Sequence, residues 1–321
     1  MRDQSQLLRI YPLVEDMDLS LGFDQRVPEL DERINDLVSA GGKRLRPLLT
    51  MIFAEAFGVD SAKALSLARL TELTHAATLL HDDVIDQAKM RRAKPSLNEK
   101  LSNTHAVLAG DALLARVMKE MAEVNEPSVL KDLAETLDQL SRGEWLQLES
   151  RFQIQRKRHQ LLQIAELKTS SLITWCVLIG ARLTQCSEQT ILLCREWSSQ
   201  FGIFFQMIDD YLDPMGTEGK PAWNDLQEGL INFFTLELVE NFPESKKKIQ
   251  SFWESQLNQN FDFPKEQMKL ARENLILRIE DRKQNCLRIL EELKKTRDFK
   301  NQESVASIEF LITKLESRMR S

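Results

Sequence analysis

Residues 61–89 read SAKALSLARLTELTHAATLLHDDVIDQAK, and this stretch decides the fold. Its apolar residues recur at the spacing of an α-helix, and the run ends in Asp82, Asp83 and Asp86. Residues i and i+4 share a helix face, so Asp82 and Asp86 form a carboxylate pair that points one way. The pattern predicts a long core helix with acidic side chains at its C-terminal end.

A second cluster of the same form, Asp-Asp-x-x-Asp, closes the apolar stretch 188–213 with Asp209, Asp210 and Asp213. Two unit charges ~5 Å apart repel by roughly 3 kcal/mol at an effective dielectric of ~20, so six carboxylates around one cavity would need cations. Hard divalent ions, Mg²⁺ above all, prefer oxygen ligands. The two clusters therefore predict a carboxylate–Mg²⁺ site that keeps open positions for phosphate oxygens.

The composition favours an all-α protein. Only 11 Gly and 9 Pro interrupt the 321 residues, and 42% of them are hydrophobic, which allows a sizeable core. The net charge of -6 argues against a nucleic-acid partner, and we expect no membrane span because no run of 18 apolar residues occurs. The four cysteines form no CxxC pair, which predicts reduced thiols in a cytoplasmic protein. The N-terminus carries acids and no long apolar core, so it does not read as a signal peptide.

Short breaks divide the chain into successive helices. We expect them over 28–40, 44–57, 61–89, 105–123, 127–149, 156–183, 188–213, from about 225, from 245, over 264–296 and over 301–319. No Pro/Gly/Ser-rich linker splits them, so we predict a single domain over 1–321, with 1–25 the candidate for a loosely packed N-terminal segment. Two long apolar helices that end in carboxylates predict a bundle around a central apolar cavity with a polar mouth.

Basic groups suited to diphosphates accompany the aspartates. They lie in Gly41-Gly42-Lys43-Arg44-Leu45-Arg46-Pro47, Arg91-Arg92, Lys168-Thr169 and Gly219-Lys220. Arginine grips phosphate in a fork, and lysine supplies a point charge. Each stretch alone is more often solvated surface, as is a lone Asp-x-x-x-Asp. Two aspartate clusters in apolar helices together with four basic stretches indicate diphosphate chemistry.

These motifs together resemble the all-trans polyprenyl diphosphate synthases, the head-to-tail isoprenyl chain elongation enzymes, from about residue 28 to 240. The matching stretches are Gly41–Pro47, His75 with His81–Asp86, Arg91-Arg92 with Pro95-Ser96, Gly110-Asp111, Lys168-Thr169, Phe205–Asp213, and Gly219-Lys220 with Asp225. Ala93 replaces the family's usual glycine. The resemblance implies a long-chain member with the all-α fold of the isoprenoid synthase type, a single-domain helical bundle that forms a homodimer.

The resemblance also implies the roles of the site residues. Three Mg²⁺ ions would be held mainly by Asp82, Asp86 and Asp209, with Asp83, Asp210 and Asp213 completing the clusters. Isopentenyl diphosphate would be held by Gly42, Lys43, Arg46, His75 and Arg92. The allylic diphosphate would be held by Arg91, Lys168, Thr169, Gln206 and Lys220. Thr169 and Gln206 would stabilise the allylic cation with their oxygens, and Lys168, which grips the leaving group, completes the catalytic set.

Two elements depart from the family pattern. The family's Lys and Thr after Asp225 are Leu230 and Asn232, and its Gly-Gln-x-x-Asp element starts here with Gly143-Glu144. A charged contact is worth roughly 1.5–3 kcal/mol, so its loss predicts weaker allylic affinity or slower ionisation. The basic residues near the C-terminus, Arg318 among them, read as solvated.

Small residues near the first cluster predict a long product. Thr78 lies one turn before Asp82, and the resemblance makes Ala77 and Ala112 length-setting positions as well. Burial of each CH₂ is favourable by ~0.8 kcal/mol, so elongation continues until a bulky side chain blocks it, which predicts a product of about C25 to C45. The alternatives are a medium-chain, geranylgeranyl-forming enzyme and a non-catalytic regulatory subunit of a heteromeric synthase.

Overall fold

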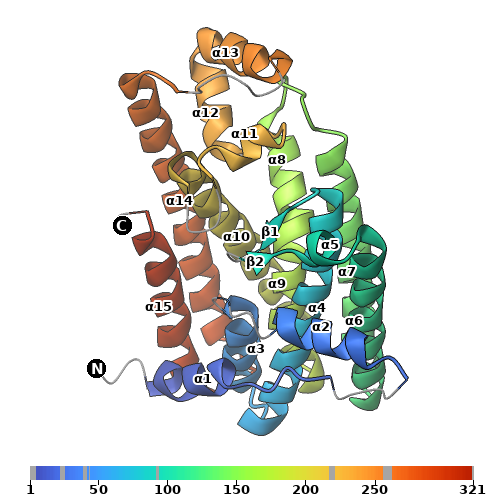
Figure 1. Cartoon of the computed structure of the whole chain (residues 1–321). Coiled ribbons are helices and arrows are strands. Elements are labelled where there is room, and N and C mark those ends of the chain that lie inside the picture. Colours follow the sequence, from blue (N-terminus) through green and yellow to red (C-terminus); the bar gives the residue numbers. More distant parts are fainter. Residues whose placement is uncertain are drawn as a thin grey trace. The chain divides into compact units, whose positions relative to one another are not determined.

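The computed structural model of the chain describes residues 5–21, 26–38, 42, 44–91, 94–216, 221–255 and 262–319 (Figure 1). These residues are helical apart from short connections and one two-stranded hairpin, so the predicted all-α class is confirmed. The chain divides into two compact units, and each is described by itself. The single domain expected over 1–321 stays a prediction.

Unit 1 comprises Met1–Glu135, Leu172–Arg195 and Glu292–Phe310. Its complete elements are α1 (Ser5–Glu15), α2 (Pro28–Val38), α3 (Leu45–Ala56), α4 (Ser61–Ile85), β1 (Met90–Arg91), β2 (Lys94–Pro95), α5 (Leu97–Lys100) and α6 (Asn103–Glu123). It also holds most of α9 (Ser171–Leu183) and parts of α7 (Pro127–Leu148), α10 (Glu188–Leu212), α14 (Lys265–Lys294) and α15 (Glu303–Ser317).

Helix α4 is the core of unit 1 and packs against both α3 and α6. Its N-terminus is capped by Asp60, whose carboxylate accepts a hydrogen bond from the Lys63 amide at 3.0 Å. The helix ends at Ile85 instead of continuing to 89, and Asp86 is its C-cap. The chain then turns back in an antiparallel hairpin that pairs Met90 with Pro95.

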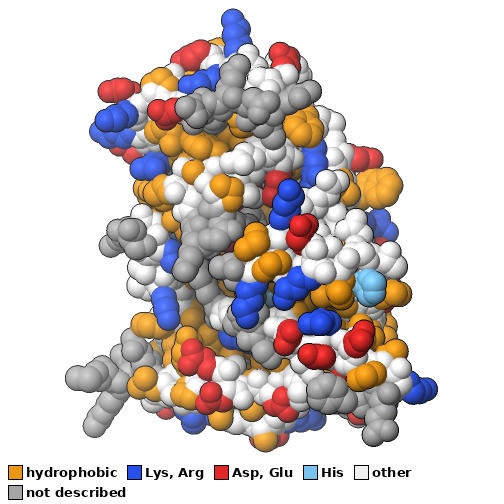
Figure 2. All heavy atoms as spheres, viewed as in Figure 1, with side chains coloured by type: hydrophobic (Ala, Val, Ile, Leu, Met, Phe, Trp, Pro, Cys, Tyr) orange, Lys and Arg blue, Asp and Glu red, His pale blue; other side chains and the backbone are white. Residues whose placement is uncertain are grey.

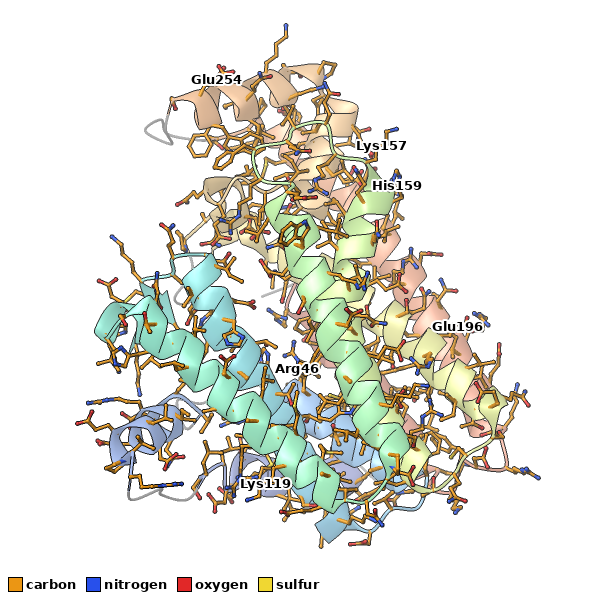
Figure 3. The ribbon with its side chains drawn as sticks, turned by 90° about the vertical axis from the view of Figure 1, so that its right-hand side faces the viewer. Arg46, Lys119, Lys157, His159, Glu196 and Glu254 are labelled. Atoms are coloured by element: carbon orange, nitrogen blue, oxygen red, sulfur yellow. The ribbon has the colours of Figure 1, made fainter. Side chains whose placement is uncertain are left out.

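Unit 2 comprises Thr136–Ser171, Glu196–Glu291 and Leu311–Ser321. Its own elements are α8 (Arg158–Ala165), the π-helix η2 (Glu166–Ser170), the 3₁₀ turn η3 (Asp213–Met215), α11 (Asn224–Gln227), α12 (Phe233–Asn241) and α13 (Pro243–Glu254). It also contains the remainders of α7, α10, α14 and α15. Lys157 and His159 mark the start of α8 in Figure 3.

One described helical stretch, Arg158–Leu183, is long and apolar enough to cross a membrane by length and composition. However, 72% of its apolar window is buried inside the protein, as in the core helix of a globular protein. On the face drawn in Figure 2, Lys and Arg side chains are interspersed with Asp and Glu. The coloured residues of that face thus show no extended basic stripe of the kind that binds nucleic acid.

The N-terminal helix α1 is well packed over its described residues. Ile10 is fully buried, Gln6 donates to Glu55 Oε2 at 2.9 Å, and both terminal nitrogens of Arg9 reach the Glu55 carboxylate at 2.6–2.8 Å. This differs from the loosely packed segment expected for 1–25. The cause is a tertiary contact between α1 and α3, which short-range patterns do not show.

Replacing Glu55 with glutamine removes the negative charge that pairs with Arg9 and is expected to destabilise the protein by about 1–3 kcal/mol. The cost stays moderate because the Arg9 side chain is half exposed, so water still solvates its charge. Burial pushes the pKa of Glu55 up, but hydrogen bonds from Arg9, Ser61 and Gln6 outweigh it and lower the pKa. The ionised contact therefore stabilises the fold above the unfolded pKa and is lost as pH falls through the lower folded pKa. Thermal unfolding of wild type, Glu55→Gln and the exposed control Glu32→Gln measures this. A Glu55→Gln deficit that persists unchanged at pH ~3 contradicts the charge assignment.

Candidate active site

The first aspartate cluster lies in the last turn of α4. Asp83 is fully buried, and Arg91 in β1 donates from Nε to its Oδ1 at 2.8 Å. The other oxygen of Asp83 is shielded from water and accepts no hydrogen bond from the described residues. Burial raises the pKa of Asp83, and Arg91 opposes the rise. Asp82 and Asp86 are both partly exposed, so the middle aspartate is built into the protein and the outer two face outward.

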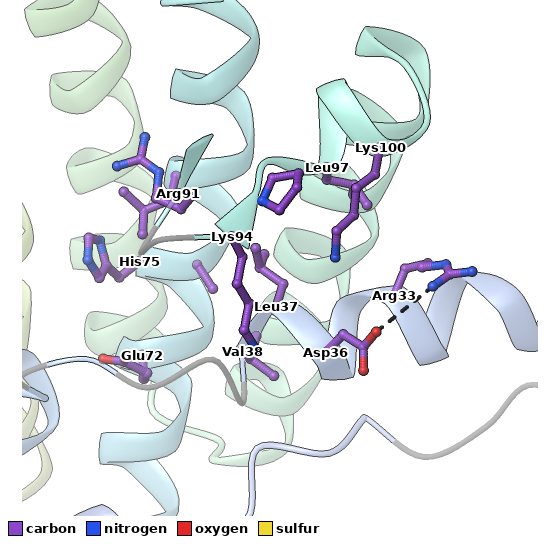
Figure 4. A pocket seen from close by; sticks show the side chains of 13 residues that line it. Arg33, Asp36, Leu37, Val38, Glu72, His75, Arg91, Lys94, Leu97 and Lys100 are labelled. Atoms are coloured by element: carbon purple, nitrogen blue, oxygen red, sulfur yellow. Dashed lines mark ion pairs between the residues drawn. The ribbon is translucent and has the colours of Figure 1, made fainter. Parts of the chain in front are cut away.

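Unit 1 contains a pocket of about 170 Å³, and Arg91, the partner of Asp83, is one of the residues that line it (Figure 4). Helix α4 contributes His75, and β1 contributes Arg91, which also bonds Asp83. Lys94 and Lys100 line the same pocket. The structure thus brings together His75 and Arg91, both predicted to hold diphosphate. The two lysines were not predicted: Lys94 lies between the matched Arg91-Arg92 and Pro95-Ser96 but is not one of the matched residues, and Lys100 lies beyond them.

The glycine-rich basic stretch divides its cations between two roles. Arg44 has a left-handed backbone with φ of 48°, and its Nη1 lies 2.5 Å from Glu72 Oε1, so its charge is used within the fold. Arg46 is partly exposed on the first turn of α3, labelled in Figure 3. Gly42 has φ of 154°. Lys43 and Arg92 lie outside the described residues.

The second aspartate cluster ends α10 in unit 2. Asp210 is buried and accepts hydrogen bonds from the Phe233 amide and from Gln206 Nε2, both at 2.8 Å. Burial raises the pKa of Asp210 well above its ordinary value, and the charge of Asp225 adds to the rise. Asp209 is more open than Asp210: 39% of its side chain is exposed. Its partner is Arg318, whose Nη1 lies 2.9 Å from Oδ1.

Asp213 organises the loop that follows the second cluster. Its Oδ1 accepts from the Asp225 amide at 3.2 Å, and its Oδ2 accepts from Asn232 Nδ2 at 3.3 Å. Asn232 also donates to Asp225 Oδ2 at 2.8 Å and caps α12. Leu230 is buried and supplies no cation at the position of the family's lysine. The asparagine therefore ties the loop to the aspartates.

The π-helix η2 carries two of the predicted catalytic residues. Thr169 donates from Oγ1 to Gln206 Oε1 at 2.8 Å, so the structure joins these two predicted partners. Lys168 forms an ion pair with Glu144 of α7. Lys220 lies outside the described residues. A π-helical turn inside a longer helix frequently marks a functional position.

The proposed length-setting residues all lie in unit 1. Ala77 is fully buried in α4. Thr78 is partly exposed, and its hydroxyl donates to the His75 carbonyl at 2.9 Å. Ala112 is partly exposed on α6. Of the three, only Ala77 is fully buried.

The carboxylates that face outward fit a hard divalent cation. Asp82 and Asp86 lie one turn apart at the end of α4, and such oxygen ligands suit Mg²⁺ while leaving positions for water or phosphate. Among the described residues, no group of three or more His, Cys, Asp or Glu side chains is placed to hold a metal. Of the six predicted ligands, the buried Asp83 and Asp210 already bond Arg91, Gln206 and backbone.

The prediction that Arg318 is solvated is wrong. Only 23% of its side chain is exposed, and it pairs with Asp209. For Glu144, the sequence indicated only a departure from the family pattern and no role. In both cases the partner lies far away in the sequence, so no local pattern could have indicated the contact.

An all-α fold with two aspartate clusters beside basic groups defines the class, a candidate diphosphate-binding enzyme. The polyprenyl synthetase family model matches residues 27–269, and the chain belongs to that family. It is 34% identical over 248 residues to a prenyl transferase of Synechocystis sp., covering 73% of this chain and 77% of the relative. It is 36% identical over 210 residues to component 2 of the heptaprenyl diphosphate synthase of Geobacillus stearothermophilus, covering 64% and 66%.

Solved structures agree over nearly the whole chain. A decaprenyl diphosphate synthase from Rhodobacter capsulatus superposes with a TM-score of 0.85 at 25% identity, covering 100% of this chain and 99% of the other. A polyprenyl synthase from Caulobacter crescentus CB15, complexed with calcium and isoprenyl diphosphate, gives 0.79 at 26% identity, covering 99% and 96%. The family predicted from the sequence is confirmed, and with it the class of enzyme, a prenyltransferase.

Proposed function

We propose that this chain condenses isopentenyl diphosphate with an allylic diphosphate, head to tail and in trans, to give a long-chain polyprenyl diphosphate of about C25 to C45. The observation that carries the proposal is the pocket that shares Arg91 with the first aspartate cluster. Arg91 lines this pocket and also bonds Asp83, so one cation links the cavity to the aspartates. A metal–diphosphate group needs both kinds of side chain.

Separate groups of residues bind the allylic diphosphate, isopentenyl diphosphate and the metal. Arg91, Lys168 and Lys220 bind the leaving diphosphate, and Lys43, Arg46, His75 and Arg92, with the Gly42 backbone, bind isopentenyl diphosphate. Asp82, Asp86 and Asp209 would hold Mg²⁺, which would supply positive charge to neutralise the departing diphosphate.

The reaction needs no protein nucleophile. The allylic C–O bond breaks, and its electron pair leaves with the diphosphate. The double bond of isopentenyl diphosphate forms the new C–C bond, and a proton then passes to the released diphosphate. Thr169 and Gln206 present oxygens to the allylic cation, and their mutual hydrogen bond fixes the orientation of the Gln206 amide.

The decisive test uses the purified full chain with Mg²⁺, isopentenyl diphosphate and farnesyl diphosphate. Thin-layer chromatography of the dephosphorylated product should show chains longer than geranylgeranyl. A geranylgeranyl product alone identifies the medium-chain alternative. No product from the chain alone favours a subunit of a heteromeric synthase, for which the similarity to a relative named as a component is the motivating observation.

We further propose a homodimeric, cytoplasmic enzyme that binds three Mg²⁺ per active site. The homodimer follows from the family resemblance and the cytoplasm from the four free cysteines, of which Cys176, Cys194 and Cys286 are buried. Light scattering of the pure chain after size exclusion should give twice the 37.1 kDa of one chain. A monomeric mass contradicts the homodimer.

Bulk near Asp82 is expected to shorten the product. Thr78→Phe places an aromatic ring one turn before Asp82 at a partly exposed position and should remove at least one isoprene unit from the main product. Ala77→Phe should act likewise, but Ala77 is fully buried, so overpacking by about 1–3 kcal/mol is also expected. Ser66→Phe, on the exposed surface of α4, is the matched control. An unchanged product from Thr78→Phe and a folded Ala77→Phe removes both positions from length control.

A further inference from the structure

Glu144 contacts Lys168, the lysine that we propose binds the leaving diphosphate. It projects from α7, and its carboxylate forms an ion pair with the ammonium of Lys168 in η2. Both partners lie in unit 2. The carboxylate of Glu144 therefore places a negative charge directly at Lys168.

The glycine at position 143 allows the close approach of α7 and η2 that this contact needs. A Cβ on Gly143 would lie 2.8 Å from the Lys168 Cγ and 3.0 Å from the Lys168 amide nitrogen, closer than side chains tolerate. Glycine therefore lets α7 approach η2, and the next residue, Glu144, reaches the ammonium. The pair is fixed by the packing of two helices and does not depend on two flexible surface side chains.

The pair is also shielded. Only 12% of the Glu144 side chain and 21% of the Lys168 side chain is exposed. Apart from this ion pair, no donor among the described residues bonds either oxygen of Glu144. A carboxylate taken out of water with one cationic partner holds that partner firmly, because charges interact more strongly where solvent screening is low.

We propose that Glu144 is a positioning residue that holds the ammonium of Lys168 in the substrate-free enzyme and competes with diphosphate for it. The inference rests on the proposed role of Lys168. Glu144 keeps the ammonium in place before substrate arrives, weakens the binding of the allylic substrate and of product pyrophosphate, and so speeds pyrophosphate release.

Titration calorimetry of the full chain with pyrophosphate and Mg²⁺ tests the competition in a double-mutant cycle. Glu144→Gln keeps the side-chain shape and should tighten pyrophosphate binding by about 3- to 30-fold. Lys168→Gln should weaken it, and Glu144→Gln should have no further effect in that background. The control Glu149→Gln removes a charge from an exposed residue that bonds Trp145, and should leave binding unchanged. Thermal unfolding verifies that every variant folds.

Steady-state kinetics gives a second readout that a merely structural role would not move. Glu144→Gln should lower KM for the allylic diphosphate and, where product release limits turnover, lower kcat as well. Equal tightening in the presence and absence of Lys168, or no tightening with a folded variant, overturns the proposal. Failure of the proposed function looks different: the wild type itself would then bind no pyrophosphate and form no prenyl product.

Discussion

Asp209→Asn is expected to lower kcat/KM by about 10³-fold or more while leaving the unfolding temperature almost unchanged. Asp209 is partly exposed, with 39% of its side chain open to solvent, and it forms an ion pair with Arg318. Asparagine keeps the shape and one oxygen but removes the charge that a divalent cation requires. The Mg²⁺ concentration that gives half-maximal activity should rise, and calorimetric Mg²⁺ binding should weaken in parallel.

The control for Asp209→Asn is Asp281→Asn, an equal change of charge at an exposed position of α14. It should leave both activity and Mg²⁺ dependence unchanged. Wild-type kinetics in Asp209→Asn would show that the second cluster does not bind the metal. A large fall in unfolding temperature would instead assign Asp209 a structural role like that of the buried Asp210.

Four predicted ligands of metal or diphosphate already have protein counter-ions, in three ion pairs. Arg91 bonds Asp83, Lys168 pairs with Glu144, and Arg318 pairs with Asp209. These ion pairs neutralise charges that would otherwise repel their neighbours in the absence of substrate. With the roles proposed above, substrate and metal binding would be an exchange of partners, and its free energy would be the difference between two sets of ion pairs.

The helices could be predicted because their signals are local. Apolar spacing placed the helices around 44–57, 127–149 and 188–213, and the structure has α3, α7 and α10 there. The predicted helix over 61–89 ends early because the chain returns through the hairpin at Arg91, and hairpin pairing competes with helical hydrogen bonds. Helix propensity alone does not predict whether the helix continues to residue 89 or the hairpin forms.

The parts that could not be predicted depend on contacts between distant segments. The π-helix η2 has no sequence signature, and its surroundings involve Gly143 in α7 and Gly202 in α10. The motifs indicated Asp83 and Asp210 as metal ligands, but only the structure shows that both are buried and bonded to the protein. Spacing identifies which carboxylates lie together, whereas burial decides which of them can meet an ion.

Gly202→Ala is expected to destabilise the protein by about 1–3 kcal/mol and to lower kcat/KM by about 10²-fold. A Cβ at Gly202 would lie 2.2 Å from Ser170 Oγ and 2.6 Å from Ser170 Cα, so either α10 or η2 must move. Gln206 follows one turn later on the same face of α10 and accepts the Thr169 hydrogen bond across this contact. Moving η2 away therefore displaces Thr169 and Lys168 from the positions in which they act.

Thermal unfolding and steady-state kinetics of Gly202→Ala measure the two effects separately. Adding Ser170→Gly removes the Oγ and Cβ that the new methyl group meets, and should restore part of both stability and kcat. Recovery stays partial because the Ser170 Cα remains within 2.6 Å. Full activity in Gly202→Ala would mean that the close approach of α10 to η2 is not needed for catalysis. Lost stability with unchanged kcat in the folded fraction would assign the contact to packing alone, since a misplaced catalytic group lowers the rate of every folded molecule.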